Sequence, residues 1–242
     1  MNRLATVWGT VALIVATSAD SAAQITLGQL DNFQTGTTLL GWQQGTLAPP
    51  SGLTRVGGGQ GGASDFYMQV VGDGAPGAGG RITAFNNAQW TGNYSAAGVT
   101  AIEMDLWAPA TNTQNLSFRI ALKTGPGMTS GYVSTTAFTV PNDATWRHAT
   151  FQISASQMTA IGAPAPFETF ITSVGELRVL HSSTISLNGQ TINGAVGIDN
   201  ITTNPIPEPA GLLAVASLAL SGTAWLVRRR RRSGLGAVGR PE

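Results

Sequence analysis

Short runs of alternating apolar and polar residues, separated by breaks rich in glycine and proline, are the feature that most constrains how this chain folds. The runs recur at nearly regular intervals through the middle of the sequence, and almost no helical period accompanies them. Glycine accounts for 31 of the 242 residues, which is typical of a chain with many turns. The pattern predicts an all-β fold, and about eight strands of this length predict a β-sandwich.

The expected strands lie between the glycine and proline clusters. In chain order they span residues 66–71, 81–85, 101–107, 116–123, 132–140, 146–153, 176–181 and 195–202. Only the segment 154–161 has a helical pattern, so a short helix is expected there. The glycine-rich segments 57–62 and 72–80 are expected to be loops. Both match the G-x-G-x-x-G spacing, but each precedes strand-like sequence, so nucleotide binding is not expected.

Alternation within two of these strands assigns a core face, because successive side chains of a strand point to opposite sides. In 101–107 the expected core residues are Ile102, Met104 and Leu106, and the opposite side carries Glu103, Asp105 and Trp107. In 116–123 the expected core residues are Leu116, Phe118, Ile120 and Leu122, and the opposite side carries Ser117, Arg119, Ala121 and Lys123.

The N-terminus has the three parts of a secretory signal peptide. A short cationic segment, 1–3, precedes the apolar segment 4–16, and the small residues 21–23 suit a signal peptidase. Cleavage is expected after Ala23, which makes residues 1–23 the signal peptide. A retained membrane anchor is the alternative, but about thirteen apolar residues fall short of the ~20 that span a bilayer.

The C-terminus has the pattern of a single transmembrane helix. Residues 210–227 carry no charge, and five arginines follow at 228–232. Eighteen uncharged residues are just long enough to cross a bilayer, and the positive-inside rule places the arginine-rich tail, 228–242, in the cytoplasm. A buried core helix is the alternative, but a core seldom stops against five arginines, which are costly to bury.

The segment 204–209 stands directly before this apolar span. It contains Pro207, Glu208 and Pro209, and its prolines require an extended chain. This tripeptide, the apolar span and the arginine cluster together resemble the PEP-CTERM sorting signal of Gram-negative bacteria. The resemblance implies cleavage by an exosortase after a transient stay in the inner membrane, and release to the cell surface or an exopolysaccharide matrix. The tail 233–242 departs from the family, whose signals usually end near the arginines.

Between these ends lies the exported domain, 24–203, with six basic and nine acidic residues. Such a domain has no basic surface for phosphate backbones, so nucleic acid is not an expected partner. The chain has no cysteine, which excludes disulfides, zinc-thiolate sites and thiol catalysis.

Three short pieces of the domain resemble the galactose-binding-like jelly roll of many carbohydrate-binding modules. They are 31–34 leading to 41–42, then 146–151, and 197–201. The resemblance implies a jelly-roll-like sandwich and a structural calcium ion held between the first and last strands, for which Asp31 and Asp199 are the candidate ligands. The alternative is that Asp199 ends a strand in a turn and Asp31 is solvated.

Candidate catalytic groups are few. Glu103 and Asp105 share one strand face, and glycoside hydrolysis requires a pair of carboxylates, but acidic residues on a solvated strand are ordinary. His148 and His181 each lie in an expected strand, and no G-x-S-x-G motif accompanies them. Catalytic residues are therefore not assigned.

The candidate ligand-binding residues are Asp105, Trp107 and Arg119. Trp107 lies opposite the core face beside Asp105, and Arg119 is expected on the adjacent strand, so together they would form an aromatic and polar platform. The alternative is that Trp107 caps the end of the sandwich. The sequence favours a non-catalytic carbohydrate-binding module with extracellular polysaccharide as partner, followed by a structural matrix protein without a small ligand and then by a glycan-active hydrolase.

Overall fold

The structure is a computed structural model and describes residues 24–36, 38–45 and 53–204. One antiparallel sheet has the strand order β10 (Arg147–Gln152), β6 (Ala101–Trp107), β13 (Asn193–Asn204), β4 (Gly62–Asp73) and β3 (Leu53–Gly59). A short strand, β1 (Leu30–Asp31), pairs with the end of β13. This sheet is called the β6 sheet below.

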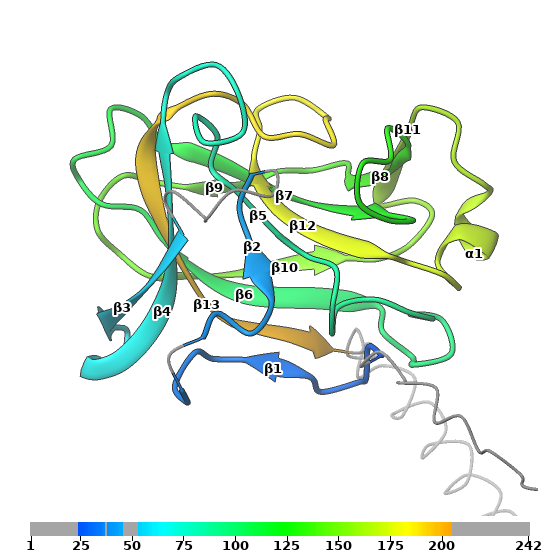
Figure 1. Cartoon of the computed structure of the whole chain (residues 1–242), viewed down its shortest axis with the longest axis horizontal. Helices are drawn as coiled ribbons and strands as arrows, with labels where there is room; N and C mark the ends of the chain where they lie inside the picture. The colour runs from blue at the N-terminus through cyan, green and yellow to red at the C-terminus, as the bar shows by residue number, and fades with distance from the viewer. Residues whose placement is uncertain (1–23, 37, 46–52, 205–242) are drawn as a thin grey trace, which may run out of the picture.

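The second antiparallel sheet, called the β7 sheet, packs against the first (Figure 1). Its strand order is β11 (Met158–Ile161), β8 (Gly131–Ser134), β7 (Leu116–Lys123), β12 (Glu176–His181), β5 (Thr83–Asn86) and β2 (Trp42–Gln43), and β9 (Phe138–Val140) also pairs with β7. A one-turn helix, α1 (Phe167–Phe170), precedes β12. The predicted all-β sandwich is confirmed.

The core lies between the two sheets, where the predicted inward faces meet. All the predicted core residues of β6 and β7 are fully buried: Ile102, Met104, Leu106, Leu116, Phe118, Ile120 and Leu122. Burial of each such side chain contributes about 1.5–3 kcal/mol to stability. The outward sides of β6 and β7 therefore form the two external faces of the sandwich, and any binding site on the strands must lie there.

The predicted strands at β6, β7 and β12 have the bounds observed in the structure. The predicted strand 132–140 is interrupted, because β8 ends at Ser134 and β9 begins at Phe138. The predicted helix at 154–161 is wrong, since its second half is β11, which pairs with β8. The expected loop 57–62 is instead a tight hairpin between β3 and β4, in which Gly58 and Gly62 have positive φ values that favour glycine.

A β-bulge in β13 shapes one external face. Asp199 pairs with Asp105, but the next pair of β13 with β6 is Thr202 with Glu103, so β13 holds an extra residue. That residue is Asn200, whose φ of 49° lies in the left-handed region. As a result Asp199 and Asn200 both lie on the outer side, and Ile201 returns to the core.

Several sequence predictions concern residues outside those that the structure describes. These are the signal peptide 1–23, the motif Pro207, Glu208 and Pro209, the span 210–227 and the tail 228–242. Within 24–36, 38–45 and 53–204, no helix is both long and apolar enough to cross a membrane.

Candidate ligand-binding face

Three aromatic rings gather on the outer side of the β6 sheet. Trp107 of β6 stacks on Trp146, which precedes β10, with ring centroids 6.2 Å apart and planes at 30°. Tyr67 of β4 lies 5.3 Å from the Trp146 ring and 6.1 Å from the Trp107 ring. Tyr67 is buried, whereas both tryptophans are half-buried. This cluster is called the aromatic trio.

The aromatic trio meets over a glycine of the central strand. Gly197 of β13 pairs with Trp107, and a Cβ atom at this position would lie 2.9 Å from the Tyr67 ring and 3.0 Å from the Trp146 ring. Real Cβ atoms essentially never approach ring carbons so closely, so a glycine here allows the rings to lie on the strand backbone.

A row of polar side chains lies next to the aromatic trio. Asp105 accepts a hydrogen bond from the Asn200 amide at 2.9 Å and lies 2.9 Å from Nδ1 of His148. The other ring nitrogen of His148 lies 3.5 Å from Glu103. The Asp105 carboxylate is the main cause of the raised pKa of His148. The His148 side chain is 56% exposed, so its imidazole ring is accessible to solvent.

Asp199 lies directly opposite Asp105 and is almost completely buried. Burial raises the pKa of Asp199 to about 7, and the nearby Asp65 and Asp105 add to the shift. Its Oδ1 accepts a hydrogen bond from the backbone N–H of Asn200 at 2.8 Å. Near neutral pH this carboxyl group is therefore divided between its neutral and charged forms.

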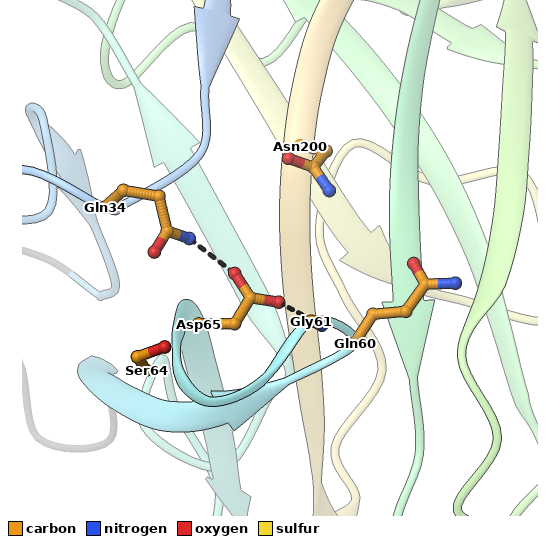
Figure 2. Close-up of a pocket in the computed structure, with 6 residues that line it drawn as sticks. All are labelled: Gln34, Gln60, Gly61, Ser64, Asp65 and Asn200. Atoms are coloured by element: carbon orange, nitrogen blue, oxygen red, sulfur yellow. Dashed lines mark hydrogen bonds between the residues drawn. The ribbon is translucent and has the colours of Figure 1, made fainter.

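A pocket of about 510 Å³ continues this surface beyond the bulge, and its lining residues are Gln34, Gln60, Gly61, Ser64, Asp65 and Asn200. Figure 2 shows Gln34 and Asp65 directed at one another, with the Asn200 side chain nearby. The Gln34 amide and the Gly61 N–H each donate to Asp65 at 2.7 Å. Asn200 joins the pocket to Asp105, so the aromatic trio, the polar row and the pocket form one external face.

This face is suited to a ligand with both apolar and hydroxyl-bearing surfaces. Aromatic rings offer flat apolar area, while amides and carboxylates donate to and accept from hydroxyl groups. Trp107 and Asp105 were both predicted to lie on this side. Trp146, Tyr67 and Asn200 were not singled out, because each reaches the face through pairing with strands distant in sequence or through the bulge.

Arg119 does not lie on this face. The prediction that it neighbours Trp107 is wrong, because β6 and β7 belong to different sheets. Arg119 is buried on the outer side of the β7 sheet, where its guanidinium donates to the carbonyl oxygens of Ser182, Ser134 and Thr135. A guanidinium with these partners is a structural group, so Arg119 is not part of the candidate site.

Asp31 and Asp199 do not meet either. Asp31 pairs with Ile201 on the core side of β13, whereas Asp199 lies on the outer side. The Asp31 carboxylate accepts hydrogen bonds from the indole N–H groups of Trp42 and Trp90 at 2.7 Å, and from Gln89 at 3.1 Å. The two carboxylates therefore do not fit a shared calcium ion, which requires several oxygens around one point.

No other metal centre is evident in the described part of the chain, where no three His, Cys, Asp or Glu side chains are grouped to hold an ion. A structural calcium ion stays a prediction, without Asp31 and Asp199 as its shared ligands. Its test is the melting temperature of the protein measured with calcium and with a chelator.

Comparison with known proteins finds similarity in structure alone. No protein-family model matches the sequence, and no curated protein is detectably similar to it. A family 11 carbohydrate-binding module from Clostridium thermocellum, in complex with a β-1,3-1,4-mixed-linked tetrasaccharide, is 15% identical with a TM-score of 0.48, over 76% of this chain and 100% of the module. A carbohydrate-binding module specific for non-crystalline cellulose is 13% identical with a TM-score of 0.44, over 75% of this chain and 98% of the module.

An exo-β-agarase is 7% identical with a TM-score of 0.50, and the match covers 76% of this chain and 25% of the agarase. At such identity the likeness concerns the fold alone. The described residues thus share a β-sandwich fold with one part of a larger enzyme.

Proposed function

We propose that the exported domain is a non-catalytic carbohydrate-binding module, which holds an extracellular polysaccharide on the outer face of the β6 sheet. The aromatic trio over Gly197 is the observation that supports this most strongly. Sugar rings have apolar faces of C–H groups, and half-buried tryptophans provide flat surfaces on which such faces stack.

The polar groups beside the aromatic trio supply the second half of saccharide recognition. Asp105, His148 and Asn200 lie in one hydrogen-bonded group, and Asn200 and Asp65 line the adjacent pocket. Hydroxyl groups along the rim of a sugar chain need donors and acceptors at fixed positions, and these side chains hold one another in place. A chain stacked on the tryptophans would place its hydroxyls over this group.

Affinity electrophoresis of the full-length protein tests the proposal. The gels contain mixed-linked β-glucan, agarose, hydroxyethyl cellulose or no polysaccharide. Trp107→Ala and Trp146→Ala are compared with Phe138→Ala, which removes a half-buried aromatic ring from the β7 sheet. We expect retardation by at least one polysaccharide, weakened about tenfold in each tryptophan variant and unchanged in Phe138→Ala.

Three outcomes count against the proposal. Migration that no polysaccharide retards would favour the structural matrix protein, and release of reducing ends from a polysaccharide would favour the hydrolase. Binding that all three variants retain would place the saccharide elsewhere on the protein.

We further propose that the chain is exported through its signal peptide and sorted through Pro207, Glu208 and Pro209. The order of tripeptide, apolar span and arginine cluster supports this. Alanine substitution of all three residues should leave an unprocessed, membrane-bound form that cell fractionation detects. Unchanged processing and release in that variant would rule the sorting motif out.

A further inference from the structure

A second pocket lies on the outer side of the β7 sheet, on a different sheet from the proposed saccharide site. Its volume is about 120 Å³, and its wall includes Arg81, Thr83, Phe85, Arg178, Asn188 and Gly189. The loop between β12 and β13 forms one rim, and Figure 1 shows this yellow loop beyond β12. The segment around Arg81 forms the other rim, and Arg81 bridges to Thr191 of the loop.

The buried polar atoms that lack a hydrogen-bond partner among the described residues cluster here. They are Oγ1 of Thr83, Nε of Arg81 and Oε1 of Gln44. Thr83 and Arg81 line the pocket, and Gln44 donates to the Arg81 carbonyl and precedes Gly45 on the rim. A buried polar group without a hydrogen-bond partner lowers stability, so three at one place call for an explanation.

The Thr83 hydroxyl is aimed at the pocket wall. A Cβ atom at Gly189 would lie 2.2 Å from Oγ1 of Thr83, so only a glycine leaves room for the hydroxyl in this direction. Thr83 is 9% exposed, and its hydroxyl has no partner in the part of the chain described. The hydroxyl is therefore buried against Gly189, a residue of the pocket wall, without a hydrogen-bond partner among the described residues.

Two guanidinium groups bring unused donors to the same place. The Arg81 side chain makes no hydrogen bond or ion pair with any described residue. Arg178 donates through Nε to Glu176 and through Nη1 to Leu187 and Asn188, which leaves Nη2 without a partner in the described chain. The Arg178 guanidinium also lies 5.6 Å from the centre of the Phe85 ring.

The local charge is positive although the domain as a whole is acidic. Glu176 is the carboxylate shared by Lys123, at 3.3 Å, and Arg178, at 2.5 Å. Arg81 adds a third cation, and the described residues that line the pocket include no Asp or Glu. An anion placed between Arg81 and Arg178 would balance this excess.

We propose that this pocket binds a carboxylate group. A guanidinium group binds the two oxygens of a planar carboxylate through parallel hydrogen bonds, and the Arg81 guanidinium has the unused donors for such a pair. Arg178 can add one further hydrogen bond through Nη2. A water molecule occupies about 30 Å³, so a pocket of about 120 Å³ accepts a carboxylate and the carbons next to it. Phe85 provides an apolar wall for those carbons. Short organic acids and uronic acid residues of acidic polysaccharides both carry this group.

Matched ligands test this site by NMR. The full-length protein, labelled with ¹⁵N-arginine, is titrated with D-galacturonate, D-galactose and acetate, and the Nε–H signal lost in Arg81→Lys is assigned to Arg81. We expect this signal to shift with galacturonate and not with galactose, since the two sugars differ only in the carboxylate. A matching shift with acetate would identify small acids as sufficient, and a shift with galacturonate alone would identify the uronic acid.

Variants provide the control. Arg81→Gln should weaken galacturonate binding at least about tenfold, whereas Arg147→Gln, which removes an exposed guanidinium paired with Asp143, should not. An Arg81 signal that does not move, or that galactose moves equally, would overturn the proposal and leave a site for water only. Arg81→Gln should not alter retardation by neutral polysaccharides, so failure of this site and failure of the saccharide face are distinguishable.

Discussion

The two external faces of the sandwich arise from the same strand alternation but differ in what covers them. On the β6 sheet the outward residues Trp107 and Asp105 stay partly accessible. On the β7 sheet the outward residues Arg119 and Lys123 lie beneath the loop that follows β12, whose Leu187 packs in a small apolar cluster. A fully buried charged residue must find internal partners, whereas a partly accessible residue remains available to a ligand.

The largest effect is expected for the charged group beneath the loop, which consists of Glu176, Lys123 and Arg178. Glu176→Gln should lower the free energy of unfolding by about 3–5 kcal/mol, because it leaves the buried Lys123 and the half-buried Arg178 without their shared carboxylate. Urea unfolding followed by circular dichroism measures the change. The exposed pair of Asp143 with Arg147 is the control, since Asp143→Asn should leave stability nearly unchanged. Equal effects of the two substitutions would contradict a structural role for the covered face.

The contrast between the two sides of a sheet can also be tested on β13. Asp31, on the core side, is buried. Asp31→Ala should lower the free energy of unfolding by about 2–4 kcal/mol, because the buried indole N–H groups of Trp42 and Trp90 lose their acceptor. Thermal and urea unfolding report the loss. A variant as stable as the original chain would show that these hydrogen bonds contribute nothing to the interior.

Asp199 lies on the outer side of the same strand, and its replacement should raise stability rather than lower it. Its folded-state pKa is raised from 3.8 to about 7, so the folded chain binds this proton more tightly than the unfolded chain. The associated stability is present below pH ~4 and is lost as pH rises toward ~7. Asp199→Asn should therefore raise the free energy of unfolding above pH 7, by about 1–3 kcal/mol. The expected signature is a flatter stability profile between pH 4 and 8 in the variant, and an unaltered profile would refute it.

The smallest expected effect concerns His148. Because Asp105 is the main cause of its raised pKa, Asp105→Asn should move the His148 pKa back toward 6.5. The stabilising charge interaction is present below the unfolded-state pKa and fades as pH rises through the folded-state pKa. An NMR titration of the imidazole signals measures the pKa of His148, with His181 as the internal control. If the pKa of His148 is the same in both proteins, Asp105 is not the cause of its shift.

The sequence predicted local features well and non-local ones poorly. Alternation correctly assigned Ile102, Met104 and Leu106 to the core and Trp107 to the outside, because the side-chain period of a strand is a local property. Arg119 was misplaced because its neighbourhood depends on which strands share a sheet, and β6 and β7 do not. The pattern of a single strand carries no information about that pairing.

Two further residues show the same limit. Asp199 and Asp31 were expected to meet because the first and last strands pair, and they do pair. The bulge at Asn200, however, turns Asp199 to the opposite side from Asp31. Trp146 reaches Trp107 across a strand pairing that joins residues about forty positions apart in sequence, as the pair of Arg147 with Leu106 shows. Site prediction failed where it depended on register rather than on alternation.

The central claim, that the aromatic trio on the uncovered face binds saccharide, is tested most directly at Gly197. Gly197→Ala retains all three aromatic residues but places a methyl group within about 3 Å of two of their rings. Calorimetric titration with the saccharide found in the gel screen should show affinity lowered about tenfold, in a variant whose circular dichroism is unchanged. Affinity equal to that of the original chain would contradict the account, because the arrangement of the rings would then not matter for binding.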